Sequence, residues 1–155
     1  MNRPHESPPT VLVVEDEPEL VEIYGTYLRD EFDVLTATSG AEALALVDGT
    51  VDVVLLDRGM PNMSGEEVLE ELRARGCDTS VAMVTGSEPD ADIVELPFDE
   101  YLVKPIERER LIRTVQLLTN RSSFEEKSRE FFRLASRKNS FETEANVDKE
   151  VYAAL

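Results

Sequence analysis

Apolar-rich runs alternate with stretches of helical spacing along the first 119 residues. The runs cover residues 11–14, 34–35, 51–56, 81–84 and 101–103. Between the first two runs, apolar side chains recur every three or four positions, at Leu20, Ile23, Tyr24, Tyr27 and Leu28. Short apolar runs are typical of strands buried on both faces, and the wider spacing is typical of amphipathic helices. The pattern therefore predicts an α/β fold with five strand–helix repeats and a parallel sheet.

Local signals mark where several of these helices begin and end. Ser39 with Glu42 and Ser64 with Glu67 have the spacing of capping boxes, in which each side chain satisfies a backbone N–H at a helix start. Gly76 has the position of a helix stop. The stretch 87–99 contains two prolines and few apolar residues, so at most a stunted helix is expected there.

The composition divides the chain into three parts. Residues 1–9 are polar and proline-rich and are expected to form a flexible lead-in before one α/β domain over 10–119. Residues 120–155 are predicted to form a helical extension, because Phe124, Phe131 and Leu134 recur at helical spacing. No apolar run approaches the roughly 20 residues that a membrane helix needs. We expect a cytoplasmic protein with no membrane partner.

The net charge of -17 lies entirely within residues 1–120. Residues 1–120 hold nine Lys and Arg against 26 Asp and Glu, whereas residues 121–155 hold seven of each. Such an acidic surface repels DNA phosphates, so we expect no direct nucleic-acid binding by this part. An acidic, lysine-poor composition also resembles that of proteins from salt-loving cells, and it suggests the hypothesis that folding depends on salt.

Four predicted strands end in polar residues with complementary chemistry. Glu15 and Asp16 follow the first strand, Asp57 the third, Thr85 the fourth and Lys104 the fifth. In an open parallel sheet these ends meet where the strand order reverses. Clustered carboxylates recruit a cation, and oxygen ligands suit Mg²⁺. A carboxylate can attack phosphorus to form an aspartyl phosphate, while lysine and threonine bind phosphate oxygens.

Lys104 is the only lysine among residues 1–120, where arginine occupies every other basic position. Its place at a strand end, directly before Pro105, favours a specific role over that of a random surface charge. The alternative is a purely structural cluster of charges at the strand ends.

Four motifs in order resemble the receiver domain of response regulators. They are Val-Glu-Asp-Glu at 14–17, Leu-Leu-Asp-Arg-Gly-Met-Pro-Asn-Met-Ser-Gly at 55–65, Val-Thr-Gly at 84–86 and Tyr-Leu-Val-Lys-Pro at 101–105. The resemblance covers about Thr10 to Thr119. It implies a flavodoxin-like, doubly wound sheet of order 2-1-3-4-5. It also implies a phosphorylation-controlled signalling switch of a two-component system, in which a sensor histidine kinase phosphorylates Asp57.

The resemblance also implies a magnesium site. Asp16 and Asp57 would bind Mg²⁺ directly, and the backbone carbonyl of Gly59 would be a third protein ligand. Glu15 would help to position the ion, often through water.

The remaining implied roles concern the phosphoryl group. Lys104 would contact it, Thr85 would move onto it, and Tyr101 would change rotamer in response. Gly59 and Gly86 depart from the family pattern, in which larger residues are common at these positions. Both glycines are expected to open the site to water, and we predict a labile phosphoaspartate.

The last part of the chain is similar to archaeal response regulators with a HalX extension. The resemblance rests on Glu88-Pro89 followed by Phe98-Asp99-Glu100-Tyr101, and on the segment Leu134-Ala135-Ser136-Arg137-Lys138. For this extension we favour self-association or partner docking, with a possible homodimer through the last receiver helix and the extension.

Two other functions stay open. One is a Mg²⁺-dependent aspartyl-phosphate phosphatase or hydrolase with Asp57 as nucleophile. Many such enzymes carry a second acid two residues later, where this chain has Gly59. The other is a DNA-binding transcriptional regulator, although no helix-turn-helix or zinc pattern follows residue 120 and His5 is the only histidine. Under the leading hypothesis the chain is no enzyme beyond its own phosphorylation and dephosphorylation on Asp57.

Overall fold

The computed structural model describes residues 8–86 and 96–120. The strands are β1 (Thr10–Val14), β2 (Asp33–Ala37), β3 (Val53–Asp57), β4 (Ser80–Thr85) and β5 (Glu100–Val103). The helices are α1 (Pro18–Leu28), α2 (Gly40–Leu46), α3 (Gly65–Ala74) and a last one over 108–120. Within the described ranges, no helix has the length and apolar content needed to cross a membrane. Most of the predicted lead-in, stunted helix and extension lies outside the described residues.

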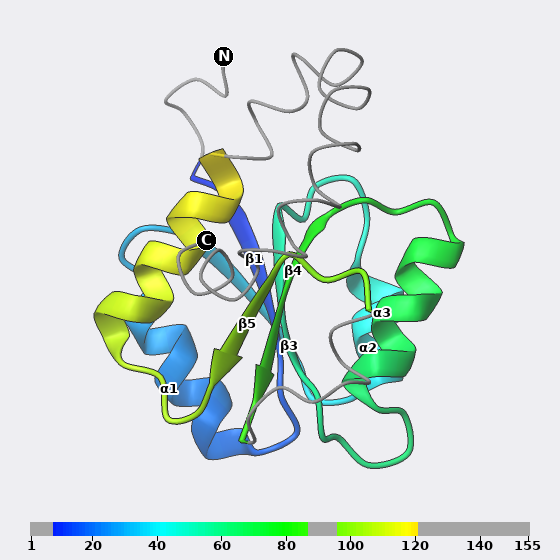
Figure 1. Ribbon diagram of the computed structural model, residues 1–155. Helices are drawn as coiled ribbons and strands as arrows, with labels where there is room; N and C mark the ends of the chain where they lie inside the picture. The colour runs from blue at the N-terminus through cyan, green and yellow to red at the C-terminus, as the bar shows by residue number, and fades with distance from the viewer. Residues whose placement is uncertain (1–7, 87–95, 121–155) are drawn as a thin grey trace, which may run out of the picture. The chain divides into compact units, whose positions relative to one another are not determined.

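The five strands form one parallel sheet in the order β2-β1-β3-β4-β5 (Figure 1). This confirms the predicted fold class and strand order. The strand order reverses between β1 and β3, which pair side by side from Val11 opposite Val53 to Val14 opposite Leu56. The carboxyl ends of these two strands therefore open onto the same edge of the sheet, which is where an open α/β sheet binds its ligands.

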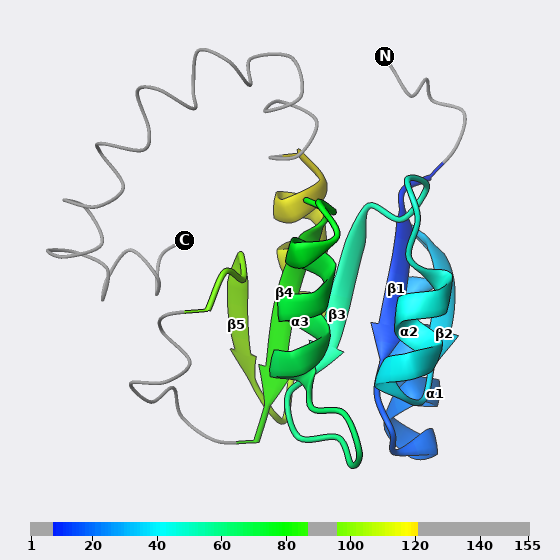
Figure 2. The same ribbon diagram turned by 90° about the vertical axis from the view of Figure 1, so that its right-hand side faces the viewer.

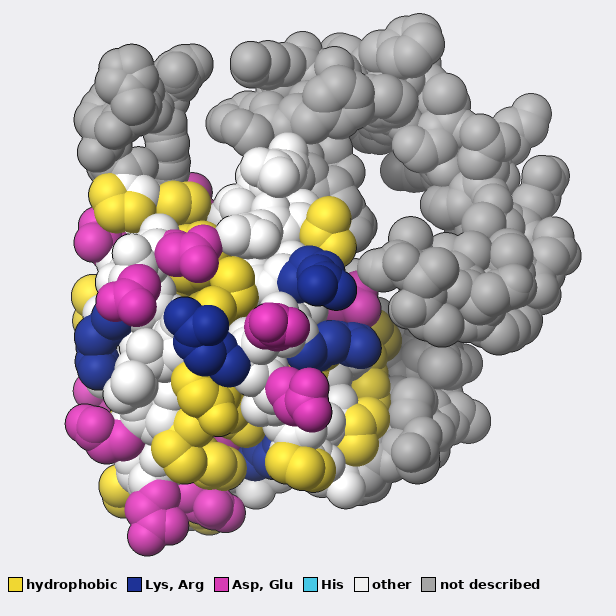
Figure 3. Space-filling model, turned by 90° about the vertical axis from the view of Figure 1, so that its left-hand side faces the viewer, with side chains coloured by type: hydrophobic (Ala, Val, Ile, Leu, Met, Phe, Trp, Pro, Cys, Tyr) yellow, Lys and Arg dark blue, Asp and Glu magenta, His cyan; other side chains and the backbone are white. Residues whose placement is uncertain are grey.

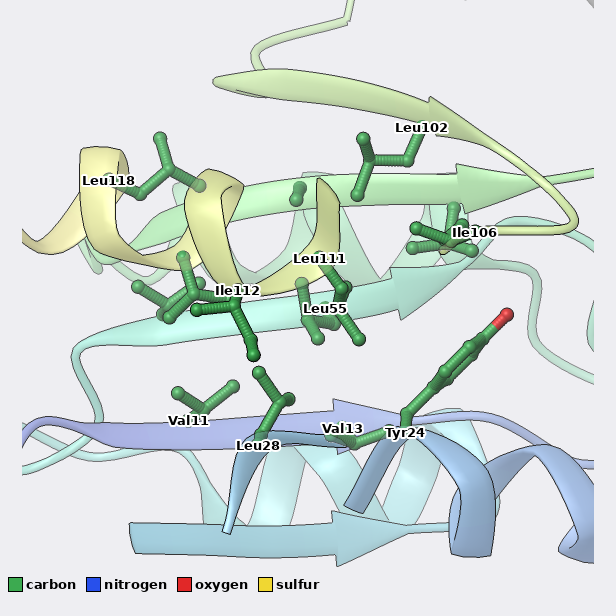
Figure 4. Close-up of a cluster of buried hydrophobic side chains, with 14 of the residues drawn as sticks. Val11, Val13, Tyr24, Leu28, Leu55, Leu102, Ile106, Leu111, Ile112 and Leu118 are labelled. Atoms are coloured by element: carbon green, nitrogen blue, oxygen red, sulfur yellow. The ribbon is translucent and has the colours of Figure 1, made fainter. Parts of the chain in front are cut away.

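Helices cover both faces of the sheet, so the central strands are buried on both sides. Figures 1 and 2 show α1 and the helix 108–120 on one face, and α2 and α3 on the other. Alternate strand residues fill two separate cores. The first core, shown in Figure 4, includes Val11, Val13, Leu55, Leu28 and Leu111. The second includes Leu12, Val14, Leu56, Val68 and Leu72. Burial on both faces explains why the strands appear in the sequence as continuous apolar runs.

The predicted helix signals have the expected geometry with one difference. Ser64 and Glu67 form a complete capping box. The Ser39 side chain accepts a hydrogen bond from the Glu42 N–H, but the Glu42 carboxylate accepts from the Thr38 N–H at 2.8 Å instead of closing the box. Gly76 has a φ of 81°, the left-handed conformation that glycine adopts without strain, and it ends α3 as predicted.

Two predicted element boundaries were wrong by one or two residues. Val51 lies before β3, although it is buried, and its N–H donates to the Asp48 carbonyl in a turn. The helical spacing of Leu44 and Val47 predicts that Val47 lies within the second helix, but it is the residue that caps the end of α2 in an extended conformation. In both cases an apolar side chain that packs on the core from an element end has the same sequence pattern as one inside the element.

The face over α1 and the helix 108–120 carries basic and acidic side chains side by side (Figure 3). The helix contributes Arg108, Arg110 and Arg113. The acidic excess that composition indicates is therefore interrupted by positive charge on this face. Net charge by itself is a weaker argument against nucleic-acid contact here than over a uniformly acidic surface.

Candidate functional site

Three carboxylates meet at the carboxyl ends of β1 and β3. Glu15 and Asp16 follow β1 directly, and Asp57 is the last residue of β3. One carboxylate oxygen from each lies within 4.8 Å of the other two. Glu15 and Asp57 are only 1% and 6% exposed, and Asp16 is half-buried. Because these strands are neighbours at the point where the order reverses, residues 42 positions apart in the chain share one pocket.

Lys104 supplies a positive charge to this cluster. Its Nζ lies 3.1 Å from Glu15 Oε1 and 3.4 Å from Asp57 Oδ1. Its backbone N–H donates to the Thr85 carbonyl at 2.7 Å, which aligns the end of β5 with the end of β4. Burial alone lowers the pKa of Lys104, but the contact with Glu15 and the charge of Asp57 outweigh it, and the pKa is raised. Lys104 is therefore held as an ammonium ion.

The Glu15 carboxyl is strongly perturbed. Burial raises its pKa to about 7, the negative charge of Asp57 adds to the rise, and the Lys104 ammonium only partly opposes it. Glu15 Oε2 accepts the Glu17 N–H at 3.3 Å, but among the described residues Oε1 accepts no hydrogen bond of good geometry. The Lys104 ammonium faces Oε1 at 3.1 Å, and a buried carboxylate oxygen with an imperfect hydrogen bond is costly. Three acids share one ammonium, so the residues present fit a hard divalent cation such as Mg²⁺.

Around Asp57 the site is open. The Gly59 N–H donates to Asp57 Oδ1 at 3.3 Å. Apart from the chain neighbours of each glycine, no described residue lies within 4 Å of the place where a Cβ on Gly59 or Gly86 would be. Thr85 ends β4 and is buried, with Val103 opposite it on β5. Among the described residues, nothing fills the space beside either glycine, and the opening of the site to water stays a prediction.

Tyr101 lies on β5, opposite Met83 of β4, and is half-buried. Its ring centroid is 5.8 Å from that of Phe98 at an interplanar angle of 55°, and it packs against the core under α2 and α3. This position is compatible with a plain core aromatic as well as with the switch role that the resemblance implies for Tyr101.

The sequence patterns missed two features of the site. Tyr24 was expected only as a core residue of the first helix. It is 4% exposed, and in Figure 4 its hydroxyl points toward the carboxyl ends of the strands. Burial raises the pKa of the Tyr24 hydroxyl. The positive charge of Lys104 lowers it, and the negative charges of Glu15 and Asp57 raise it further. The second feature is an ion pair between Arg58, directly after β3, and Glu66 in the first turn of α3. Nothing in helical or strand periodicity indicates either feature.

Known proteins with related sequences include proteins named as transcriptional regulators. A putative transcriptional regulator of Haloferax volcanii is 52% identical over 139 residues, which cover 89% of this chain and 23% of that protein. The transcriptional regulatory protein CpxR of Klebsiella pneumoniae is 40% identical over 120 residues, which cover 75% of this chain and 51% of CpxR. The chain therefore spans about a quarter and about half of the length of these two relatives.

Solved structures agree with this relationship. The response regulator TrrA of Thermotoga maritima, solved in complex with Mg(2+)-BeF, has a TM-score of 0.63 and 34% identity, covering 71% of this chain and 98% of TrrA. The family model for the response regulator receiver domain matches residues 11–116, which include every residue of the carboxylate and lysine cluster. This chain belongs to the response regulator receiver domain family.

Proposed function

We propose that the chain is the phosphorylation-controlled switch of a two-component system. It accepts a phosphoryl group from a sensor histidine kinase onto Asp57, with Mg²⁺, in the cytoplasm. The observation that carries this proposal is the convergence of Glu15, Asp16, Asp57 and Lys104 in one pocket. The relative TrrA, whose structure holds Mg(2+)-BeF, supports the proposed ion.

The site chemistry follows from the positions of these groups. Asp16, Asp57 and the Gly59 carbonyl would hold Mg²⁺, with Glu15 acting through water, and the ion would supply charge neutralisation for the transferred phosphoryl group. An Asp57 carboxylate oxygen attacks phosphorus, and the bond from phosphorus to the kinase histidine nitrogen breaks as the new O–P bond forms. Lys104 is already beside Asp57 Oδ1 and can bind a phosphoryl oxygen.

The switch transmits this change through the ends of β4 and β5. The Thr85 hydroxyl moves to donate to a phosphoryl oxygen, and its backbone carbonyl is bonded to the Lys104 N–H. Tyr101, three residues before Lys104 on β5, changes rotamer in response. The result is a population shift between two packings, which changes a surface for a partner or for a second copy.

The output beyond residue 119 is proposed from the sequence alone. We infer a HalX-type extension over 120–155 that takes part in a homodimer together with the last receiver helix. We propose no direct nucleic-acid contact by residues 10–119. The names of the two relatives refer to transcription, and a salt-sensitive shift of duplex DNA by the whole chain would favour the DNA-binding alternative.

The hydrolase alternative is less well supported by the site. A second acid two residues after the nucleophile is absent, because Gly59 occupies that position and has no side chain. The proposed chemistry of the chain is therefore limited to phosphorylation and dephosphorylation of its own Asp57. Turnover of an added phosphoester would overturn this view.

The decisive experiment is a beryllofluoride titration with Mg²⁺, followed by NMR on the wild type and on Asp57→Asn. We expect saturable shifts at Thr85, Lys104 and Tyr101 in the wild type and none in the variant. Acetyl phosphate should label the wild type and leave Asp57→Asn unlabelled. Equal labelling of both proteins would exclude Asp57 as the acceptor.

A further inference from the structure

An ion pair joins the two ends of the loop that follows Asp57. The Arg58 guanidinium contacts one oxygen of Glu66 through two nitrogens, with Nε at 2.8 Å and Nη2 at 2.7 Å from Oε2. The Arg58 and Glu66 side chains are only 18% and 30% exposed. A paired, partly buried contact of this kind is stronger and more directional than a typical surface ion pair.

Backbone hydrogen bonds of Arg58 hold the same loop at both of its ends. The Arg58 N–H donates to the Val84 carbonyl at 2.8 Å, and the Arg58 carbonyl accepts the Gly65 N–H at 2.9 Å. A Cβ on Gly65 would lie 2.3 Å from the Asp57 carbonyl oxygen, so glycine is required for this approach. The start of α3 thus packs directly on the backbone of the phosphoacceptor, and the ion pair closes the loop over residues 59–65.

Gly59 makes one long hydrogen bond of its own, from its backbone N–H to Asp57 Oδ1 at 3.3 Å. It has no side chain, no described residue would touch a Cβ there, and glycine is the residue with the widest choice of backbone conformations. The direction of its carbonyl must therefore be set by its neighbours. Arg58 is the neighbour on one side, and its side chain is held by Glu66 at the first turn of α3.

We propose that the Arg58–Glu66 ion pair is a clasp that positions the Gly59 carbonyl for the metal ion. This inference rests on the proposed Mg²⁺ site, and it assigns to both residues a positioning role without contact with the ion. Outer residues that orient metal ligands commonly change metal affinity by about 10- to 100-fold when they are replaced.

Charge alone predicts the opposite effect of replacing Arg58. Arg58→Met removes a positive charge next to a cation site, and by Coulomb's law this change should tighten Mg²⁺ binding. Loss of the clasp should weaken it. The sign of the change in the dissociation constant therefore separates a positioning role from a simple electrostatic one.

The test is isothermal titration of Mg²⁺ into the full chain, with thermal unfolding recorded for every variant. We expect about tenfold weaker binding for Arg58→Met. The charge-swapped double variant, Arg58→Glu with Glu66→Arg, should recover most of the affinity. The matched control is Arg75→Met, which removes the exposed Arg75–Glu71 pair at the other end of α3 and should leave Mg²⁺ affinity unchanged.

The outcomes distinguish this inference from the proposed function. If the wild type binds no Mg²⁺, the metal site itself is wrong and the clasp fails with it. If the wild type binds Mg²⁺ and a folded Arg58→Met binds equally well or more tightly, only the clasp is overturned. Should Arg58→Met fail to fold, Glu66→Gln replaces it, since it keeps the side-chain size, and unchanged affinity there would also refute the clasp.

Discussion

Replacing Glu15 with glutamine should stabilise the metal-free protein at alkaline pH. In the folded chain burial and the charge of Asp57 raise the pKa of Glu15 from 4.5 to about 7. A shift of this size corresponds to about 3 kcal/mol of unfavourable free energy once the carboxyl is ionised in both states. Lys104 loses one of its two carboxylate partners in Glu15→Gln, so we expect a net gain of about 2 kcal/mol.

The sign of the pH dependence follows from proton binding. Between pH 4.5 and about 7 the folded protein keeps a proton on Glu15 that the unfolded protein releases. Stability therefore falls as the pH rises through this window. Below pH 4.5 the carboxyl is protonated in both states, and the contribution of its ionisation vanishes. Above pH 7 the full cost is present.

The assay is urea unfolding of wild type and Glu15→Gln at pH 4, 6 and 8, with EDTA present. The difference in unfolding free energy between the two proteins should grow in favour of the variant as the pH rises. Added Mg²⁺ should reduce the difference at pH 8, since the ion stabilises the wild-type carboxylates. A difference that stays constant from pH 4 to 8 would refute the assignment of the raised pKa to Glu15.

Four further predictions follow from particular contacts or from charge. Gly65→Ala should lose about 3 kcal/mol of stability, because its Cβ would meet the Asp57 carbonyl; Gly49→Ala, in open space, is the control in the same denaturation assay. Arg73→Met should cost about 3 kcal/mol by denaturation, since Arg73 donates to the carbonyls of residues 77, 79 and 97. The phosphoaspartate should be short-lived, and Gly59→Met should lengthen its half-life in a phosphate-release assay; an unchanged half-life would contradict the role of the open site. At a net charge of -17, unfolding free energy should rise with added salt, and equal stability in dilute buffer would exclude salt-dependent folding.

Much of the fold could be predicted because its signals are local or periodic. The strand runs, the Ser64 cap and the Gly76 stop are visible in short segments, and the structure has them at the expected places. Exact boundaries could not be predicted, as at Val51, because burial begins before the first ladder residue of β3. The positions of the site residues could also be predicted, because the carboxyl ends of parallel strands lie at the same edge of the sheet.

Arg73 shows what periodicity leaves undetermined. It lies at an ordinary helical position, yet its guanidinium reaches the turn before β4, the Pro97 carbonyl and Asp99. These partners lie up to 26 residues away in sequence. An arginine that stays in solvent has the same local pattern, so its role depends on which segments the fold brings within reach of its long side chain.

The sequence by itself determined the alternation of strands and helices, the class of the sheet and the identity of the acids and lysine at the strand ends. These features depend on the order of side chains along short segments and on the shared direction of parallel strands. The tertiary structure alone decided that Glu15 is buried beside Asp57 with a raised pKa, and that Arg58 closes its loop onto Glu66. Burial and charge pairing depend on distances through space between residues remote in the chain, and a linear pattern carries no such distances.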